Sequence, residues 1–122
     1  MPTPRAVAAL LTALTLTGVQ AADPVRLGKD EVEKLLPGKT LNYANVNGSS
    51  AVVVFGVDGR ASYKTGGTRE SIGTWSIQDD GRYCIKITTG SAQDHCRFLW
   101  RTDAGLRLRN TSGEFVPVSG LD

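Results

Sequence analysis

The chain has 122 residues, of which 40% are hydrophobic and 21% charged, and its formal net charge is +2. This length fits one domain, and so small a charge gives no electrostatic footprint for nucleic acid or an anionic membrane. The basic residues are scattered along the sequence and not clustered with stacking aromatics, so no nucleic-acid partner is expected. One histidine and two cysteines are a poor metal-ligand set, so we expect no metal and no cofactor.

The first 21 residues have the pattern of a secretory signal peptide. A basic head ending at Arg5 precedes a run of small and apolar residues, and Val19 and Ala21 occupy the small-residue positions before a cleavage site. The run is shorter than the about 20 residues that a membrane-spanning helix needs. We therefore expect cleavage after Ala21, a single mature domain over residues 22–122, no membrane insertion after cleavage, and a periplasmic or secreted location.

The mature sequence begins with one predicted short helix. Asp30 is a suitable N-cap, Glu33 completes a capping box, and Pro37-Gly38 ends the helix. Three apolar residues share one face of it: Val32, Leu35 and Leu36. A helix of this length does not persist alone in water, so this face must dock against the rest of the domain.

From residue 40 onward the sequence alternates short apolar or β-branched runs with turn signals. Asn47-Gly48, Asp58-Gly59 and Asp80-Gly81 are typical of such turns. The spacing predicts a mainly β fold, in which an antiparallel meander forms a small calycin-like barrel or sandwich after the N-terminal helix.

The stretch around the first tryptophan is predicted to be structural. Trp75 and Ile77 share a strand face, and Phe55 lies in an apolar strand, so we expect all three in the core. Gly73 allows another group to approach the backbone closely. The acidic pair at residues 79–80 lies in a turn, where adjacent side chains point apart, rather than in an acid–base site.

Cys84 and Cys96 are predicted to form a disulfide, because two cysteines in an exported domain usually do. If Cys84 faces Cys96 across a hairpin, Lys86 faces Asp94, and opposite charges across strands favour this register. The bridge would help a domain of this size, whose core is small.

The same register creates a conflict, because strict alternation cannot suit both strands. Phe98 and Trp100 share a face with Cys96, while Arg97 and Arg101 share the other, apolar face. Three arrangements stay open. A bulge puts the aromatics in the core, the helix covers them from outside, or they form an exposed binding patch while the arginines enter the barrel. The four residues are therefore candidate ligand or partner contacts. An inward arginine needs an acidic partner or an anionic ligand.

The motifs LLPGKTL, VFGVDGR, GTW, DDGRYC and HCRFL occur in this order. On these motifs the chain resembles a family of small exported proteobacterial proteins, a domain of unknown function with a leading helix, a G-x-W strand and two later cysteines. The resemblance covers residues 29–108 and implies no catalytic residues. The Gly73-Thr74-Trp75 triplet is also distantly similar to the G-x-W motif of lipocalin-type barrels.

The sequence predicts a binding protein rather than an enzyme. His95 is the single histidine, and Asp94 beside it would point to the opposite strand face, which disfavours a catalytic triad. We expect an exported, envelope-associated, monomeric binding module for a small molecule or a protein. The alternative is an inhibitor or immunity-like protein that blocks an envelope enzyme with a loop, residues 65–71 or 90–94. A weak hydrolase using His95 is a third, less favoured class.

Overall fold

The computed structural model describes residues 22–45, 48–66, 69–110 and 112–122, so the expected signal peptide lies outside the described residues. The elements, in chain order, are β1 (Val25–Arg26), α2 (Lys29–Leu35), β2 (Thr40–Ala44), β3 (Ser50–Phe55), β4 (Arg60–Thr65), β5 (Ser71–Ile77), β6 (Tyr83–Thr89), β7 (His95–Arg97), β8 (Leu99–Thr102), β9 (Gly105–Arg109) and β10 (Phe115–Pro117).

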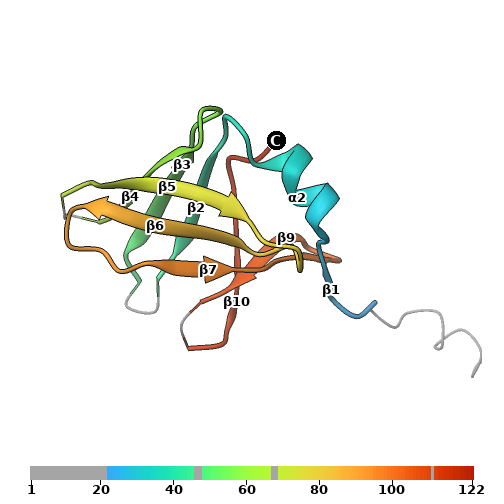
Figure 1. The fold of residues 1–122 in the computed structure, drawn as a ribbon. Coiled ribbons are helices and arrows are strands. Elements are labelled where there is room, and N and C mark those ends of the chain that lie inside the picture. Colours follow the sequence, from blue (N-terminus) through green and yellow to red (C-terminus); the bar gives the residue numbers. More distant parts are fainter. Residues whose placement is uncertain (1–21, 46–47, 67–68, 111) are drawn as a thin grey trace, which may run out of the picture.

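The strands form two antiparallel sheets (Figure 1). Strands β2 to β7 make a six-stranded meander in sequence order, which curls into a half-barrel, and β1, β8, β9 and β10 make a four-stranded sheet in that order. The chain passes from one sheet to the other through α2, between β1 and β2, and through Phe98, between β7 and β8, and Ser119 pairs with Asn42 of β2. The predicted mainly β meander with one short N-terminal helix is confirmed.

Helix α2 forms where predicted, but its N-terminus differs from the prediction. Gly28 is the N-cap, and no side chain caps the helix. Asp30 instead lies in the first turn with Glu31, where negative charge interacts favourably with the helix dipole. Val32 and Leu36 are fully buried, as the amphipathic pattern requires.

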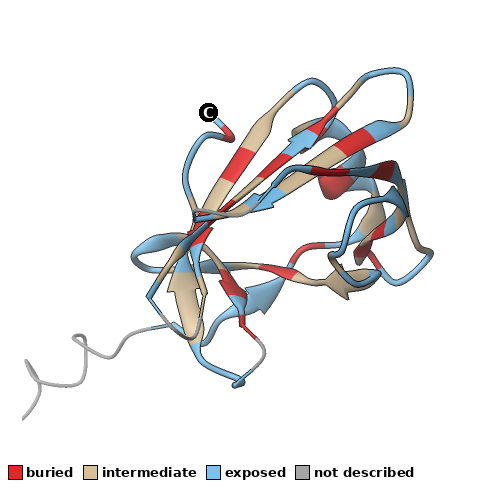
Figure 2. Ribbon diagram, turned by 90° about the vertical axis from the view of Figure 1, so that its left-hand side faces the viewer, coloured by how far each residue is buried: buried red, intermediate tan, exposed pale blue. Residues whose placement is uncertain are grey.

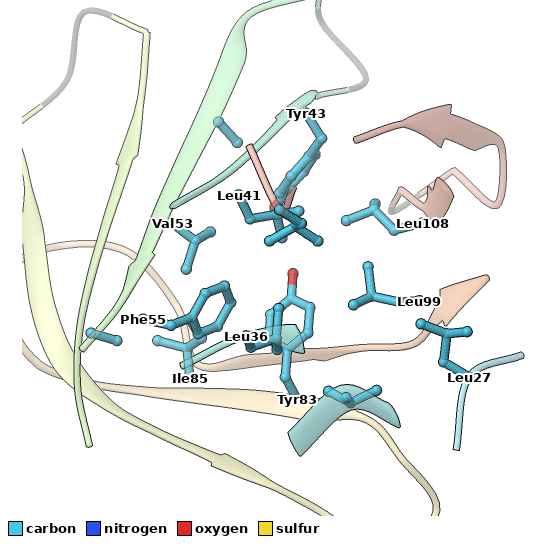
Figure 3. Close-up of a cluster of buried hydrophobic side chains, with 14 residues drawn as sticks. Leu27, Leu36, Leu41, Tyr43, Val53, Phe55, Tyr83, Ile85, Leu99 and Leu108 are labelled. Carbon is cyan, nitrogen blue, oxygen red and sulfur yellow. The ribbon is translucent and has the colours of Figure 1, made fainter. Parts of the chain in front are cut away.

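The core fills the space between the concave face of the meander and the second sheet (Figure 3). Buried and partly exposed residues alternate along β2 and β3, so each strand presents one face to this core (Figure 2). The helix contributes to it at one end of the half-barrel. The labelled core residues are Leu27, Leu36, Leu41, Tyr43, Val53, Phe55, Tyr83, Ile85, Leu99 and Leu108.

The three residues expected in the core differ in burial. Phe55 is fully buried, whereas Trp75 and Ile77 are partly buried and pack against the core. The Trp75 ring meets the Phe55 ring edge-on, with centroids 5.2 Å apart. Gly73 lies at a register shift, and a Cβ there would collide with the Lys86 carbonyl group, so the close approach expected at this glycine is present.

The acidic pair forms a turn, as predicted. The Gln78 N–H donates to the Arg82 carbonyl across the β5–β6 turn, and Gly81 has a positive φ of 96°. The two carboxylates point to different partners: Asp79 lies 3.2 Å from Lys29 Nζ, and Asp80 lies 3.0 Å from Arg82 Nε. This separation is unsuited to paired acid–base chemistry.

Candidate functional site

A disulfide joins β6 to β7 and confirms the predicted pairing of Cys84 with Cys96. The strand register places these two residues opposite each other, and it also places Tyr83 opposite Arg97. Since directly opposed residues project from the same face, the register fixes which side chains of β7 enter the half-barrel. Tyr83 is fully buried, so Arg97 lies on the inner face.

The alternation of inward and outward side chains continues from β7 through Phe98 into β8. His95, Arg97 and the fully buried Leu99 face inward, whereas Phe98 and Trp100 lie on the outer face. No bulge brings the two aromatic residues into the core. Of the three open arrangements, the chain therefore adopts the one with outward aromatics, but only Arg97 of the two arginines lies on the inner face, since the side chain of Arg101 is exposed.

The outer aromatics are covered in a way that the sequence did not indicate. The apolar residues of α2 enter the interior core instead of covering Trp100. Phe98 lies beneath the guanidinium groups of Arg26 and Arg82, and Trp100 lies beside that of Arg109. These contacts rule out the arrangement in which the helix covers the two aromatic residues. They also correct the expectation that basic residues do not cluster with aromatics. Residues distant in sequence are brought together by strand pairing.

Arg101 lies at the helix end of the molecule, where its side chain is largely exposed, and it has an acidic partner. Its Nη2 donates a 2.8 Å hydrogen bond to Glu31 Oε2 of α2. The pKa of the Glu31 carboxyl is lowered, chiefly by this hydrogen bond and also by one from the Gly28 backbone. Arg101 is thus neutralised within the chain.

Arg97 points inward at the opposite end and has no such partner. Its Nη1 donates to the Cys96 carbonyl oxygen at 3.1 Å, while its Nε is buried without a hydrogen-bond partner. Over residues 22–45, 48–66, 69–110 and 112–122, none of the ion pairs includes Arg97. A positive charge therefore stands in a partly buried place without a carboxylate to compensate it.

Three tyrosines surround Arg97. The hydroxyls of Tyr43 and Tyr83 are buried without hydrogen-bond partners in the described part of the chain. Burial raises the pKa of the Tyr43 phenol, and the neighbouring Tyr63 phenol raises it further, whereas Arg97 lowers it. Burial likewise raises the pKa of the Tyr83 phenol. The phenols of Tyr43 and Tyr83 therefore stay protonated near neutral pH and are available as hydrogen-bond donors.

His95 completes the polar group on the inner face. Its Nδ1 lies 3.1 Å from the Gln93 carbonyl oxygen, and because a carbonyl only accepts, Nδ1 carries the proton. Its Nε2 is then a buried acceptor without a partner. Burial lowers the pKa of the imidazole, and the charge of Arg97 lowers it as well, so the ring is neutral near pH 7. The ring packs against Tyr63, with centroids 4.9 Å apart.

Tyr63, His95 and Arg97 line an open pocket of about 660 Å³ at the mouth of the half-barrel, between the β4–β5 and β6–β7 loops. Its polar lining includes Tyr63, Arg69, Ser71, Gln93, His95 and Arg97, together with one carboxylate, that of Asp94. The β6–β7 loop is fixed at the rim because the Ala92 N–H donates to Ser71 Oγ at 3.2 Å. The mouth can therefore hold a ligand with hydrogen-bonding and charged groups.

The structure separates the four candidate contacts into different places. Arg97 lies in the mouth, Arg101 at the helix end, and Phe98 and Trp100 on the outer face. Tyr63 in the mouth and the buried Tyr43 near Arg97 were missed by sequence reasoning. Strand alternation carries a signal for one of them, because Tyr43 lies two residues from the buried Leu41.

Comparisons with protein-family models, curated proteins and solved structures find no match to this chain. The resemblance to an exported family of unknown function therefore stays a prediction.

The described residues provide neither a cluster of metal ligands nor a membrane-spanning helix. They contain no group of three or more histidine, cysteine or acidic side chains placed to hold a metal ion. Among the same residues, no helix has the length and apolar character needed to cross a membrane.

Proposed function

We propose that this chain is a non-enzymatic binding protein that takes a small ligand with an anionic group into the mouth of the half-barrel. The observation that carries the proposal is the contrast between the exposed, paired Arg101 and the partly buried, unpaired Arg97. Arg101 is neutralised by Glu31 at 2.8 Å, whereas Arg97 has no carboxylate partner among the described residues. Leaving a partly buried charge uncompensated is costly, and a bound anion would supply the missing partner.

The lining of the mouth suits such a ligand. A guanidinium can bind a carboxylate or phosphate through two parallel hydrogen bonds. The Tyr63 hydroxyl can donate, His95 Nε2 can accept, and Arg69 adds a second positive charge at the rim. The volume of about 660 Å³ lies within the range of small-molecule pockets. The ligand would thus bind by its acidic group at Arg97 and by polar groups nearby.

Binding without catalysis is supported by the way in which the potential acid–base residues are engaged. His95 Nδ1 faces the Gln93 carbonyl, while Asp94 Oδ1 accepts a 2.8 Å hydrogen bond from the Ile87 N–H. The histidine and the adjacent aspartate therefore serve different neighbours, whereas a triad requires the carboxylate to orient the imidazole.

We further propose that the protein acts outside the cytoplasm, in the periplasm or after secretion. The Cys84–Cys96 disulfide supports this location because disulfides persist mainly in oxidising compartments. The β6–β7 loop, one of two loops considered for an inhibitor, is hydrogen-bonded to Ser71 at the pocket rim. This favours a role in the mouth over a protruding inhibitory loop.

Thermal-shift measurements with matched ligand pairs test the binding proposal. Small carboxylates, phosphates and sulfonates are compared with their neutral amides or esters on the native protein, Arg97→Gln and the control Arg101→Gln. Some acids should raise Tm in the native protein and the control but not in Arg97→Gln. A ligand at 100 times its Kd stabilises by about 2.7 kcal/mol, which is readily detected.

Two outcomes would contradict the proposal. Acids and neutral analogues could act equally, or the acid effect could survive in Arg97→Gln. Capture of an envelope enzyme in a tight one-to-one complex, with no small-molecule effect, would instead support the inhibitor.

A further inference from the structure

The outer face of the four-stranded sheet carries arginines that alternate with aromatic rings. We call it the arginine face and define it by Arg26, Arg82, Phe98, Trp100, Arg107, Arg109 and Phe115. Strand pairing assembles most of it: Arg26 and Arg107 lie opposite Trp100 on its two sides, and Phe115 lies opposite Arg109. Directly opposed residues of paired strands project from the same face.

Phe98 anchors one half of the arginine face. The guanidinium carbon of Arg26 lies 4.1 Å from the centroid of its ring, and that of Arg82 lies 5.7 Å away. Trp100 and Phe115 anchor the other half, edge to face with centroids 5.3 Å apart. Arg109 lies 5.4 Å from the first ring and 4.5 Å from the second. Cation–π contacts therefore hold three guanidinium groups in fixed places.

The positive charge of the arginine face is only partly compensated. Asp80 pairs with Arg82 at 3.0 Å. Arg26, Arg107 and Arg109 take part in none of the ion pairs between described residues. The nearly neutral net charge of the chain thus conceals a face with three unpaired arginines.

The shape of the arginine face limits what it can bind. The pockets described for the protein, at the mouth, beside the disulfide and around the helix, are lined by other residues. The ring faces are approached by guanidinium groups, so they are poorly placed to stack the bases of a single-stranded nucleic acid. Positive charge on a sheet face without a described pocket complements an extended anionic surface.

We propose that the arginine face docks the protein on the surface of an anionic lipid bilayer. Each arginine near such a surface contributes about 1 kcal/mol, and the attraction falls off within a Debye length. Trp100 is partly buried, and the amphipathic ring of tryptophan is favoured at the headgroup level. Docking is peripheral and reversible, and it is independent of the ligand site because Arg97 lies on the inner face of β7, in the six-stranded sheet.

Co-sedimentation with lipid vesicles tests the docking. Vesicles of phosphatidylcholine mixed with phosphatidylglycerol are compared with vesicles of phosphatidylcholine alone, at low and physiological ionic strength. The triple variant Arg26→Gln, Arg107→Gln, Arg109→Gln should bind the anionic vesicles about 100-fold more weakly. The control Lys34→Gln, Arg60→Gln, Lys64→Gln removes the same charge from exposed residues elsewhere and should bind as the native protein does.

Two single variants separate the charge of the arginine face from its cation–π stacking and from the ligand site. Arg107 takes part in none of the cation–π contacts of the described residues, so Arg107→Glu leaves the stacking intact even if the triple variant fails to fold. It should weaken vesicle binding about 30-fold. Arg97→Gln should leave vesicle binding unchanged, so docking can succeed even if the ligand proposal fails.

The docking proposal would be overturned by either of two results. Equal losses in the triple variant and its control would show that overall charge alone is responsible. Binding to heparin or an oligonucleotide without binding to anionic vesicles would assign the face to a soluble polyanion.

Discussion

The two ends of the half-barrel are built from the same strands but have different chemistry. At one end α2 inserts Val32 and Leu36 among the core residues, and its Glu31 neutralises Arg101. At the other end the strands open into the pocket that contains Arg97 and His95. The presence of a short amphipathic helix thus decides which end is packed and which end is free to bind.

The largest effect is expected where the helix closes the barrel. Leu36→Ala should lower the free energy of unfolding by about 2–5 kcal/mol, because Leu36 is fully buried and its truncation leaves a cavity. Leu35→Ala, on the same helix but only partly buried, is the control and should cost clearly less. Urea denaturation measures both. Equal losses of unfolding free energy in the two variants would contradict the tight packing of Leu36 at this end of the half-barrel.

The next effect concerns the strand that carries the mouth. Cys84→Ser with Cys96→Ser removes a bridge between residues 12 apart in sequence and should cost about 3 kcal/mol of folding stability. It should also loosen β7 and so weaken binding of an acid at Arg97. Free-thiol labelling of the native protein provides an independent check, and two readily labelled thiols would contradict the bridge.

A smaller change in the free energy of unfolding is expected at Arg97 and Arg101, and it distinguishes the two arginines directly. Arg97→Met removes an uncompensated charge and should raise the free energy of unfolding of the ligand-free protein by about 1 kcal/mol. Arg101→Met removes the partner of Glu31 and should not stabilise the fold. Thermal melts of both variants in ligand-free buffer compare them. If only Arg101→Met raised the free energy of unfolding, Arg101 and not Arg97 would be the arginine with the uncompensated charge.

The smallest effect is a pH dependence that belongs to the mouth. Because the pKa of folded His95 lies below its ordinary value of 6.5, the unfolded chain binds more protons in the window between the two values. Stability from this group is therefore fully present above pH 6.5 and falls as the pH is lowered through that window. His95→Gln should remove this slope in urea titrations at several pH values. An unchanged slope would place its origin elsewhere.

Local patterns predicted the elements and the disulfide well. Turn glycines and apolar runs indicated the meander, and the expected register of Cys84 with Cys96 is present. They did not settle the faces of Phe98 and Trp100, because strand alternation requires knowing what covers the outer side. Their cover comes from Arg26 and Arg109, which reach them only through pairing of β1 and β9 with β8.

The mouth was only half predictable for a similar reason. The inward arginines were one of the open arrangements, but the acidic partner of Arg101 depends on where α2 docks. Tyr43 and Tyr63 come from β2 and β4, and only the curl of the sheet brings their phenols near Arg97. Which side chains meet in the mouth depends on contacts between strands distant in the sequence, and these cannot be predicted from local sequence patterns.

The unbroken alternation from His95 to Trp100 makes this segment sensitive to length rather than to composition. His95, Arg97 and Leu99 face the interior, whereas Phe98 and Trp100 face the exterior. Inserting or deleting one residue next to Cys96 would exchange the two sets, placing Phe98 in the pocket and Arg97 outside. Conservative substitutions should be tolerated here, whereas insertions and deletions should be confined to turns such as Asp103–Gly105. Related chains could therefore be aligned on this stretch without gaps.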